Sequence, residues 1–107
     1  MRRGDLVTVS MQGDFGKPRP ALIIQADQFD LTSNVTLLLL SATLVDAPLV
    51  RVTVDPTLTN GLRKVSQIMI DKTMTVRRDK VGPAFGRLED TAMLSVSSLL
   101  ALFLGFS

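Results

Sequence analysis

The stretch Lys17-Pro18-Arg19-Pro20-Ala21-Leu22-Ile23-Ile24 decides how the first part of this chain folds. Its second half is a continuous apolar run, which is typical of a β-strand covered on both faces. Its first half sets one arginine between two prolines. Pro20 disfavours helical backbone at Arg19, and Pro18 stiffens the approach, so the guanidinium is presented from an extended and rigid segment. The stretch therefore predicts a buried strand whose entrance carries a fixed cation.

One further strand is predicted before this stretch and several after it. Continuous apolar runs indicate strands covered on both faces, and alternation of apolar with polar residues indicates half-buried strands. Residues 27–34 are predicted to form a short helical turn or a loop, and Asn60-Gly61 is a turn signal. The expected strands cover residues 6–11, 21–26, 35–42, 50–54 and 67–71, and residues 73–77 continue the last of these or pair with it.

The chain is predicted to end in an amphipathic helix. Leu88-Glu89-Asp90-Thr91 places acidic and capping residues where a helix would begin, and Gly105 is a stop signal. Between them apolar residues recur at helical spacing: Met93, Val96, Leu99, Leu100, Phe103 and Leu104. Several short strands followed by one helix predict a mainly β (α+β) fold, a small antiparallel barrel with a helix against it. A length of 107 residues with 46% hydrophobic content suits one domain over residues 1–107.

The composition excludes several kinds of function. The sequence contains no cysteine and no histidine, so disulfides, thiolate metal sites and the commonest acid–base side chain near neutral pH are excluded. No metal or cofactor is expected. The net charge is only +2, so a polyanion would be held by a local patch rather than by the whole surface. No apolar segment has the length of a membrane span or the form of a signal peptide, so we expect no membrane partner and a cytoplasmic location.

Three side chains are candidates for chemistry. Arg19 offers a permanent charge and a planar fork of donors that suits phosphate oxygens, although it could equally form an ion pair with Asp14 or Asp71. Ser41 ends an apolar run, where its hydroxyl either bonds its own backbone or opens onto a site. Asp71 lies at the end of its strand and could act as a base if its pKa were raised. From the residues alone, an ion pair with Lys72 or Arg63 is the slightly better interpretation for Asp71.

Several of these features together resemble the MazF/PemK (Kid-like) family of toxin endoribonucleases. Arg3-Gly4-Asp5 opens the first strand, the Pro-Arg-Pro segment opens the second, and Asp27 closes it. The resemblance covers most of the chain and implies an SH3-like barrel with a C-terminal helix. It implies that Arg19 is the catalytic arginine and that Ser41 contacts the scissile phosphate. Asp71 matches an aspartate of several PemK-type members.

The resemblance has two departures and suggests a set of residues that would bind RNA. Met69 and Met74 stand where family members carry arginine, so the site would either be weaker or use other cations. Phe15, in the loop before Arg19, is the aromatic side chain expected to stack on a base. Thr43 lies two residues after Ser41 and could replace it. The side chains expected to bind RNA are Phe15, Lys17, Thr43, Lys72 and Arg77.

The resemblance implies the toxin of a type II toxin–antitoxin system, an endoribonuclease that needs no metal and inhibits translation and growth. Single-stranded RNA would be cleaved when its own 2′-hydroxyl attacks the adjacent phosphorus, leaving a 2′,3′-cyclic phosphate and a 5′-hydroxyl. This suits a chain without histidine or cysteine, because the substrate supplies the nucleophile. The resemblance also implies a homodimer with RNA in a groove across both subunits, and an acidic antitoxin as the inhibitor.

Two alternatives of other functional classes stay open. A CcdB-like gyrase poison has the same fold without a catalytic site, and the ending Leu104-Gly105-Phe106 is similar to the Trp-Gly-Ile ending of CcdB. The sequence has no tryptophan, and this alternative does not explain Arg19 between two prolines. The other alternative is a catalytically inactive barrel that binds nucleic acid or protein.

Overall fold

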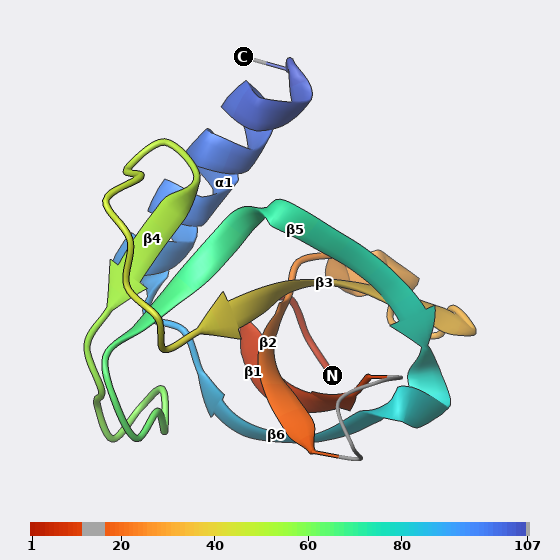
Figure 1. Ribbon diagram of the computed structural model, residues 1–107. Coiled ribbons are helices and arrows are strands. Elements are labelled where there is room, and N and C mark those ends of the chain that lie inside the picture. The colour runs from red at the N-terminus through yellow and green to blue at the C-terminus, as the bar shows by residue number, and fades with distance from the viewer. Residues whose placement is uncertain (12–16, 107) are drawn as a thin grey trace.

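The computed structural model describes residues 1–11 and 17–106, which form a strongly curled antiparallel sheet with one helix packed beside it (Figure 1). The strands follow one another in the order β4-β5-β3-β2-β1-β6 across the sheet. This confirms the predicted mainly β (α+β) fold with one C-terminal helix. The elements are β1 (Asp5–Ser10), β2 (Pro18–Ile23), the 3₁₀ turn η1 (Asp27–Phe29), β3 (Asn34–Ser41), β4 (Arg51–Val54), β5 (Ser66–Arg77), the 3₁₀ turn η2 (Arg78–Lys80), β6 (Val81–Arg87) and α1 (Asp90–Leu104).

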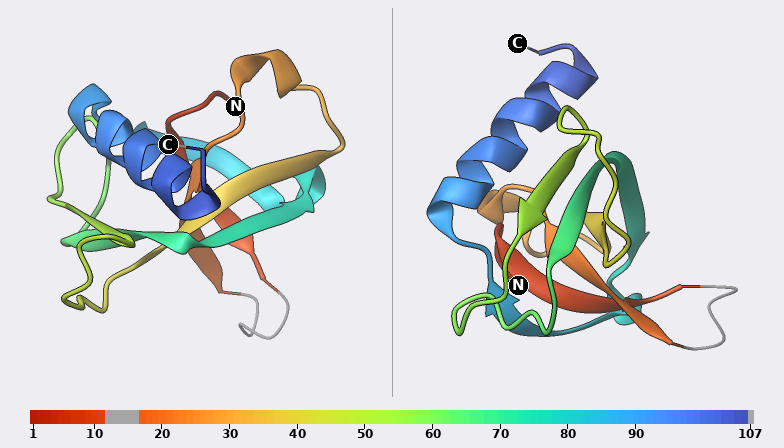
Figure 2. Two further views of the ribbon diagram at one scale, coloured as in Figure 1. Left: turned by 90° about the horizontal axis from the view of Figure 1, so that it is seen from above. Right: turned by 60° about the vertical axis from the view of Figure 1, so that its left-hand side comes forward.

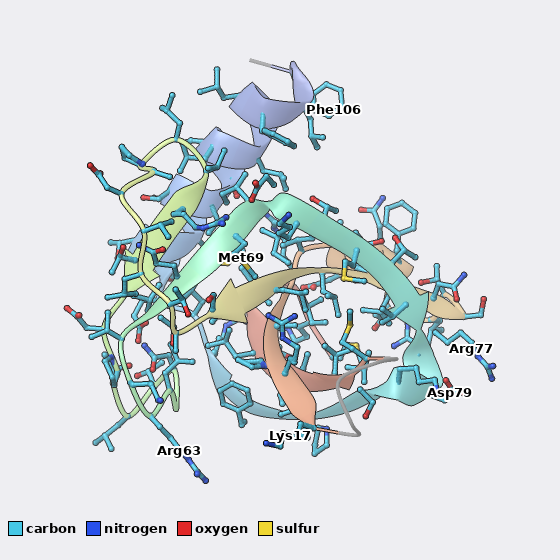
Figure 3. The ribbon with its side chains drawn as sticks, in the orientation of Figure 1. Lys17, Arg63, Met69, Arg77, Asp79 and Phe106 are labelled. Atoms are coloured by element: carbon cyan, nitrogen blue, oxygen red, sulfur yellow. The ribbon has the colours of Figure 1, made fainter. Side chains whose placement is uncertain are left out.

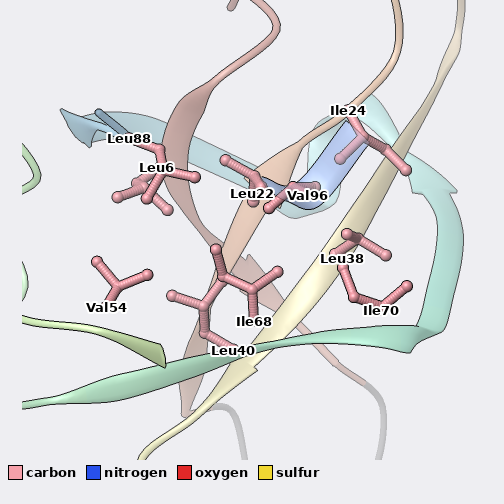
Figure 4. Close-up of a cluster of buried hydrophobic side chains, with 10 residues drawn as sticks. All are labelled: Leu6, Leu22, Ile24, Leu38, Leu40, Val54, Ile68, Ile70, Leu88 and Val96. Carbon is pink, nitrogen blue, oxygen red and sulfur yellow. The ribbon is translucent and has the colours of Figure 1, made fainter. Parts of the chain in front are cut away.

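Two apolar clusters cover the two faces of the sheet. Successive side chains of a strand point to opposite faces, so each apolar strand supplies both clusters. The first cluster includes alternate residues of the strands and Val96 of α1 (Figure 4). The second cluster is built from the residues between them. Its buried members are Val7, Val9, Ala21, Ile23, Val35, Leu37, Leu39 and Met69. The prediction that the apolar strands are covered on both faces is therefore correct.

The structure differs from the predicted strands in two places. β2 begins at Pro18 and includes both prolines, whereas the sequence placed its start at Ala21. The strand β6 (Val81–Arg87) is absent from the prediction. Its sequence, Val-Gly-Pro-Ala-Phe-Gly-Arg, lacks alternation, and a strand with an internal proline is tolerated here because β6 lies at an edge of the sheet. Of the two possibilities for residues 73–77, the structure has the continuation, because they belong to one strand, β5 (Ser66–Arg77).

The Arg3-Gly4-Asp5 segment ties the start of β1 to three other parts of the chain. The backbone N–H of Arg3 donates to Asp27 Oδ1 at 2.7 Å, and its guanidinium donates to the carbonyl of Ile24. Arg3 Nη2 also donates to Ser97 Oγ of α1 at 2.6 Å. The hydrogen bond from Arg3 is the main reason why the pKa of Asp27 lies below its ordinary value, with the charge of the neighbouring Arg2 adding to it. The motif therefore holds the N-terminus, the end of β2 and the helix together.

The helix α1 packs beside β4 and β5 (Figures 1 and 2). Much of its apolar surface remains exposed. Only Val96 is fully buried, and Gly105 ends the helix in the left-handed conformation with φ +85°, as the sequence predicts. No helix of the described ranges is long and apolar enough to cross a membrane. The large apolar side chains of this segment that remain exposed are Leu94, Leu102, Phe103, Leu104 and Phe106.

The two edge strands, β4 and β6, form no ladder with each other among the described residues. The loop of residues 55–65, which links β4 to β5, packs on β6 instead, and we call this contact the seam. Asn60 is completely buried in this loop. Its side-chain oxygen accepts from the backbone N–H groups of Thr57 and Leu62, each at 3.0 Å. Its amide donates to the carbonyl of Asp55 at 2.9 Å and to Glu89 Oε1 at 3.1 Å. Every polar group of this side chain is therefore satisfied within the seam.

Glycines allow the loop to lie directly on β6. A methyl group built on Gly86 would lie 2.1 Å from the carbonyl oxygen of Asn60, so no larger residue fits there without a backbone shift. Gly61 has φ +69°, a left-handed backbone conformation that is unfavourable for residues other than glycine. The backbone N–H of Arg87 donates to the carbonyl of Thr59 at 2.9 Å, which completes the junction. The carboxylate of Glu89, predicted to cap α1, instead bonds Thr57 and Asn60.

We predict that Asn60→Ala destabilises the protein strongly. The change leaves two backbone N–H groups and one carbonyl in a buried seam without their partner, and each unsatisfied group costs about 1–3 kcal/mol. The free energy of unfolding, measured by urea denaturation, should fall by at least about 2 kcal/mol. Asn34→Ala, at an exposed asparagine of β3, is the matched control and should change it by less than about 0.5 kcal/mol. Equal effects of the two changes would contradict this role of Asn60.

Candidate active site

A cavity of about 660 Å³ opens beside the seam between the loop of residues 55–65 and β6. Its walls come from β1, β2, β3 and β6, from the start of β5 and from the loop of residues 55–65. It is the place where the fold brings the Pro-Arg-Pro segment next to residues from distant parts of the chain. The described residues that line it are Thr8, Pro18, Arg19, Pro20, Leu40, Ser41, Ala42, Gly61, Leu62, Arg63, Lys64, Ser66 and Phe85.

The register of β2 and β3 places Arg19 and Ser41 together. These strands pair with Ala21 opposite Leu39 and Ile23 opposite Leu37. Extending that antiparallel register by two residues sets Arg19 opposite Ser41, and side chains at opposite positions lie on the same face. Both residues line the cavity and both are half-buried. Two of the three predicted chemical residues therefore share one site.

The hydroxyl of Ser41 is partly engaged by its own backbone. Ser41 Oγ accepts a hydrogen bond from the backbone N–H of Thr43 at 3.1 Å. Its own proton faces the carbonyl of Thr43 at 3.5 Å, which is too long for a strong hydrogen bond. The alternative in which Ser41 only bonds its own backbone at the strand end therefore describes part of the geometry. The hydroxyl can still donate to an anion in the cavity.

The loop of residues 55–65 adds two cations to the cavity. Arg63 and Lys64 both line it and both side chains are exposed to solvent. Figure 3 shows Arg63 extending away from the molecule at its lower edge, with Lys17 farther along the same edge. Together with Arg19, the cavity lining has three basic side chains, and none of its described residues is acidic. The site therefore favours an anionic ligand, and its proline, leucine and phenylalanine side chains favour one with an apolar part.

Asp71 lies elsewhere, in an ion pair with Arg51. Arg51 Nη1 donates to Asp71 Oδ1 at 2.7 Å, and neither residue lines the cavity. The pair forms because Arg51 of β4 lies opposite Met69, and Asp71 is the next residue on the same face of β5. The hydrogen bond from Arg51 is the main reason why the pKa of Asp71 lies below its ordinary value of 3.8. This shift is opposite to that required of a general base near neutral pH.

The other predicted RNA-binding residues are scattered. Phe15 lies outside the described residues. Lys17 is exposed at the start of β2, and Thr43 is exposed just after Ser41, so both lie near the cavity without lining it. Lys72 is exposed on β5, next to Asp71 in the chain. Arg77 pairs with Asp79 at 2.6 Å, and Figure 3 shows both on the side of the molecule opposite Arg63.

The two methionines that stand where family members have arginine belong to the core. Met69 is buried in the second cluster, and Met74 packs against it. Because each faces apolar side chains, an arginine at either place would have to be accommodated in that cluster. The cations of this site come instead from Arg19 and from the loop. The described residues contain no cluster of three or more histidine, cysteine, aspartate or glutamate side chains that could hold a metal.

Sequence reasoning missed four side chains of the cavity. Leu62, Arg63 and Lys64 follow the Asn60-Gly61 turn, and this turn is the signal that could have placed a fixed loop there. Phe85 lies in the unpredicted strand β6. Pro83 and Gly86 argue against a strand in this segment, so nothing in the sequence indicated that the ring of Phe85 lies near Arg19.

Comparison with protein families gives one match over nearly the whole chain. The sequence model of a family described as "PemK-like, MazF-like toxin of type II toxin-antitoxin system" matches residues 2–104. A curated relative from Mycolicibacterium smegmatis, named "Probable endoribonuclease MazF", is 45% identical over 108 residues. That match covers 100% of this chain and 99% of the relative.

Solved structures of low sequence identity share the fold. An endoribonuclease in complex with its cognate antitoxin, from a mycobacterial species, has a TM-score of 0.84 at 22% identity and covers 100% of this chain and 97% of its own. The Mycobacterium tuberculosis toxin MazF-mt6 has a TM-score of 0.81 at 21% identity, over 96% of this chain and 98% of its own. A MazE–MazF structure from Deinococcus radiodurans has a TM-score of 0.79 at 21% identity, over 100% and 97%.

The position of Asp71 leads to a prediction for Asp71→Asn. A carboxyl whose pKa is lowered by folding stabilises the protein above its unfolded pKa, and that contribution is lost as the pH falls through the folded pKa. The change should lower the free energy of unfolding at pH 7 by at most about 1 kcal/mol, because the pair is partly exposed. The difference should shrink when the pH falls below 3.8. Urea denaturation at several pH values measures it.

The same variant should cleave RNA at close to the wild-type rate, as should Arg51→Gln, which breaks the pair from the other side. A loss of about 100-fold or more in Asp71→Asn alone, at matched stability, would return Asp71 to the catalytic machinery as a base.

Proposed function

This chain belongs to the PemK-like, MazF-like toxins of type II toxin–antitoxin systems, and from that membership we propose that it is an endoribonuclease whose active site is the cavity around Arg19. The substrate is single-stranded RNA, whose cleavage inhibits translation and growth. The observation that carries this proposal is the meeting of Arg19, Ser41, Arg63 and Lys64 in one cavity whose described lining holds no acidic side chain. Such a lining attracts the negatively charged phosphodiester backbone and has no described carboxylate that would repel it.

Arg19 has the central role. Its guanidinium can bind two phosphate oxygens at once, and its charge stabilises the additional negative charge that develops on the phosphoryl oxygens during the reaction. The proline on either side keeps its backbone extended, so little entropy is lost when the side chain binds. Ser41, opposite Arg19, donates one hydrogen bond from its uncharged hydroxyl to another phosphate oxygen.

The nucleophile comes from the RNA. The 2′-hydroxyl oxygen forms a bond to the adjacent phosphorus while the bond from phosphorus to the 5′-oxygen breaks. Water accepts the proton of the 2′-hydroxyl, and water donates a proton to the departing 5′-oxygen, so the protons balance without a side chain as base or acid. The products are a 2′,3′-cyclic phosphate and a 5′-hydroxyl. This chemistry needs orientation and charge stabilisation from the protein, which Arg19 and Ser41 supply, and it suits a chain without histidine or cysteine.

The proposal includes the partners and location that the sequence predicts. A second copy of the chain would cover the exposed apolar residues at the end of α1, among them Leu102, Phe103 and Phe106, and would give a homodimer. An acidic antitoxin would neutralise the basic cavity as the cognate inhibitor. The protein acts in the cytoplasm as one domain over residues 1–107. The CcdB-like alternative has no support among the relatives found by sequence or by fold.

Arg19→Ala should abolish most of the RNA cleavage while the fold is kept. Loss of a donor to a developing oxyanion costs roughly 10²–10³ in rate. Arg19→Lys should restore only part of it, because an ammonium is a point charge without the bidentate fork. Ser41→Ala should cost less, because it removes one hydrogen bond from an uncharged donor and leaves the positive charge of Arg19 in place. The rates are measured on mixed-sequence RNA in excess chelator, at matched stability. Lys80→Ala, an exposed cation of η2 outside the cavity, is the control. Wild-type cleavage by Arg19→Ala would contradict the site.

Expression of the chain without a partner should arrest the growth of a bacterial host, and expression of Arg19→Ala at the same level should not. A small acidic protein encoded beside the toxin should relieve the arrest. Growth curves and total-RNA integrity are the measurements. Arrest with intact RNA and gyrase-dependent DNA breaks would support the gyrase-poison alternative, and normal growth at high protein level would remove the toxin proposal.

A further inference from the structure

We propose that Phe85 is the side chain on which this protein stacks a nucleobase of its RNA substrate, beside the phosphate held at Arg19. This inference rests on the proposed function and adds a base-binding subsite to it. It identifies the aromatic contact as a residue of β6, within the described part of the cavity.

A β-bulge turns Phe85 out of the core. In the pairing of β1 with β6, Leu6 lies opposite Gly86, but Val7 lies opposite Ala84. Phe85 is therefore an extra residue that the ladder skips. In a regular ladder it would lie opposite Val7, which is completely buried, and its ring would enter the second cluster. The bulge releases the ring, which lines the cavity and is 39% exposed.

The ring is also held in place. A methyl group built on Gly61 would lie 2.6 Å from the carbonyl oxygen of Phe85 and 3.2 Å from its ring atom Cδ1. The seam loop therefore packs directly on Phe85 and limits its motion. An aromatic side chain that is fixed before binding loses little conformational entropy when a ligand stacks on it.

No other described aromatic residue lies in the cavity. The sequence has no tryptophan, tyrosine or histidine, so aromatic stacking must use one of its five phenylalanines. Among the described ones, Phe29, Phe103 and Phe106 are exposed on η1 and at the C-terminal end of the chain and do not line the cavity. Within the described residues, Phe85 is thus the ring that shares a cavity with Arg19.

The chemistry of the cavity identifies the occupant as a nucleotide. Arg19, Arg63 and Lys64 suit phosphates, whereas Leu62 and Phe85 offer apolar surface to a flat group. In single-stranded nucleic acid the phosphate and the unpaired base are adjacent, so one nucleotide can use both parts at the same time. Stacking on an aromatic ring accepts any base, so this subsite adds affinity rather than a strict choice of sequence.

The first test compares the binding of a short RNA that contains one cleavage site, with a 2′-deoxy sugar at the scissile nucleotide so that it is not cut. Phe85→Ala should weaken binding, measured by fluorescence anisotropy in chelator, by roughly 5- to 150-fold. Phe85→Trp should bind at least as well as the wild type, and Phe85→Leu should lie between them. Phe29→Ala removes a ring that is 51% exposed outside the cavity and is the matched control. It should bind like the wild type.

Two further readouts separate stacking from loss of structure or charge. Phe85→Ala should leave the salt dependence of binding unchanged, whereas Arg63→Gln should reduce its slope by about 0.7. An abasic nucleotide introduced in turn on each side of the cleavage site should weaken binding to the wild type at one position. At that position it should not weaken binding to Phe85→Ala further, because the two changes remove the same contact.

The outcomes distinguish this inference from the proposed function. A wild-type protein that neither binds nor cleaves RNA would refute the proposed function. Cleavage that depends on Arg19, together with wild-type affinity in Phe85→Ala or with additive effects of that change and every abasic position, would refute the stacking role alone. If no abasic position weakens binding to the wild type, the stacking role is refuted even where Phe85→Ala does not fold, and Phe85→Leu then replaces Phe85→Ala in the paired comparison.

Discussion

Asn60 holds the loop of residues 55–65 against β6, and one wall of the cavity depends on that contact. Its amide group satisfies four partners at once, two backbone N–H groups, the carbonyl of Asp55 and the carboxylate of Glu89. A buried amide that lacked these partners would be strongly unfavourable, so the loop has one conformation in which they are all made. Gly86 accepts the backbone of Asn60 at a distance that excludes a side chain. The contact between Asn60 and Gly86 places residues 62–64 at the cavity and packs Gly61 against Phe85.

The opposite wall depends on β2 and β3. The register of these strands puts Arg19 and Ser41 at opposite positions, and the prolines remove N–H groups that would otherwise seek a partner in a ladder. The cavity therefore joins a rigid arginine from the centre of the sheet with a basic loop from its seam. The two walls have different tasks in our account. The sheet supplies the contact to the reacting phosphate, and the seam supplies charge and a flat apolar surface for the adjoining nucleotide.

Local patterns in the sequence were sufficient for most of the fold. Alternation and apolar runs predicted β1, β3 and β4, because these strands bury the residues that carry the pattern. Helical spacing up to Gly105 predicted α1, although only the first part of that pattern, Met93 to Leu100, packs on the core, and Phe103 and Leu104 are exposed. The strand β6 was not predicted, because it is an edge strand with a bulge. Such a strand tolerates Gly82, Pro83 and Gly86 and needs no alternation of apolar with polar residues.

The site was predictable only where one strand or a close neighbour decides it. Arg19 between two prolines and Ser41 after an apolar run could be identified, since both signals are local. The partner of Asp71 could not, because several cations were available and only the register of β4 with β5 selects Arg51. The role of Phe85 could not be predicted either, because it depends on contacts between distant parts of the chain. Its place in the cavity follows from a bulge and from a loop more than twenty residues away in the chain.

The most direct test of the account is an NMR titration of the protein with the uncleavable RNA, in which the backbone amide signals are followed. If RNA binds in the Arg19 cavity, the largest shifts fall on Arg19, Ser41, residues 62–64 and Phe85, with small shifts at Arg51. Shifts centred on Arg51 and its neighbours or on α1, with the cavity unaffected, would contradict the claim that RNA binds in the Arg19 cavity.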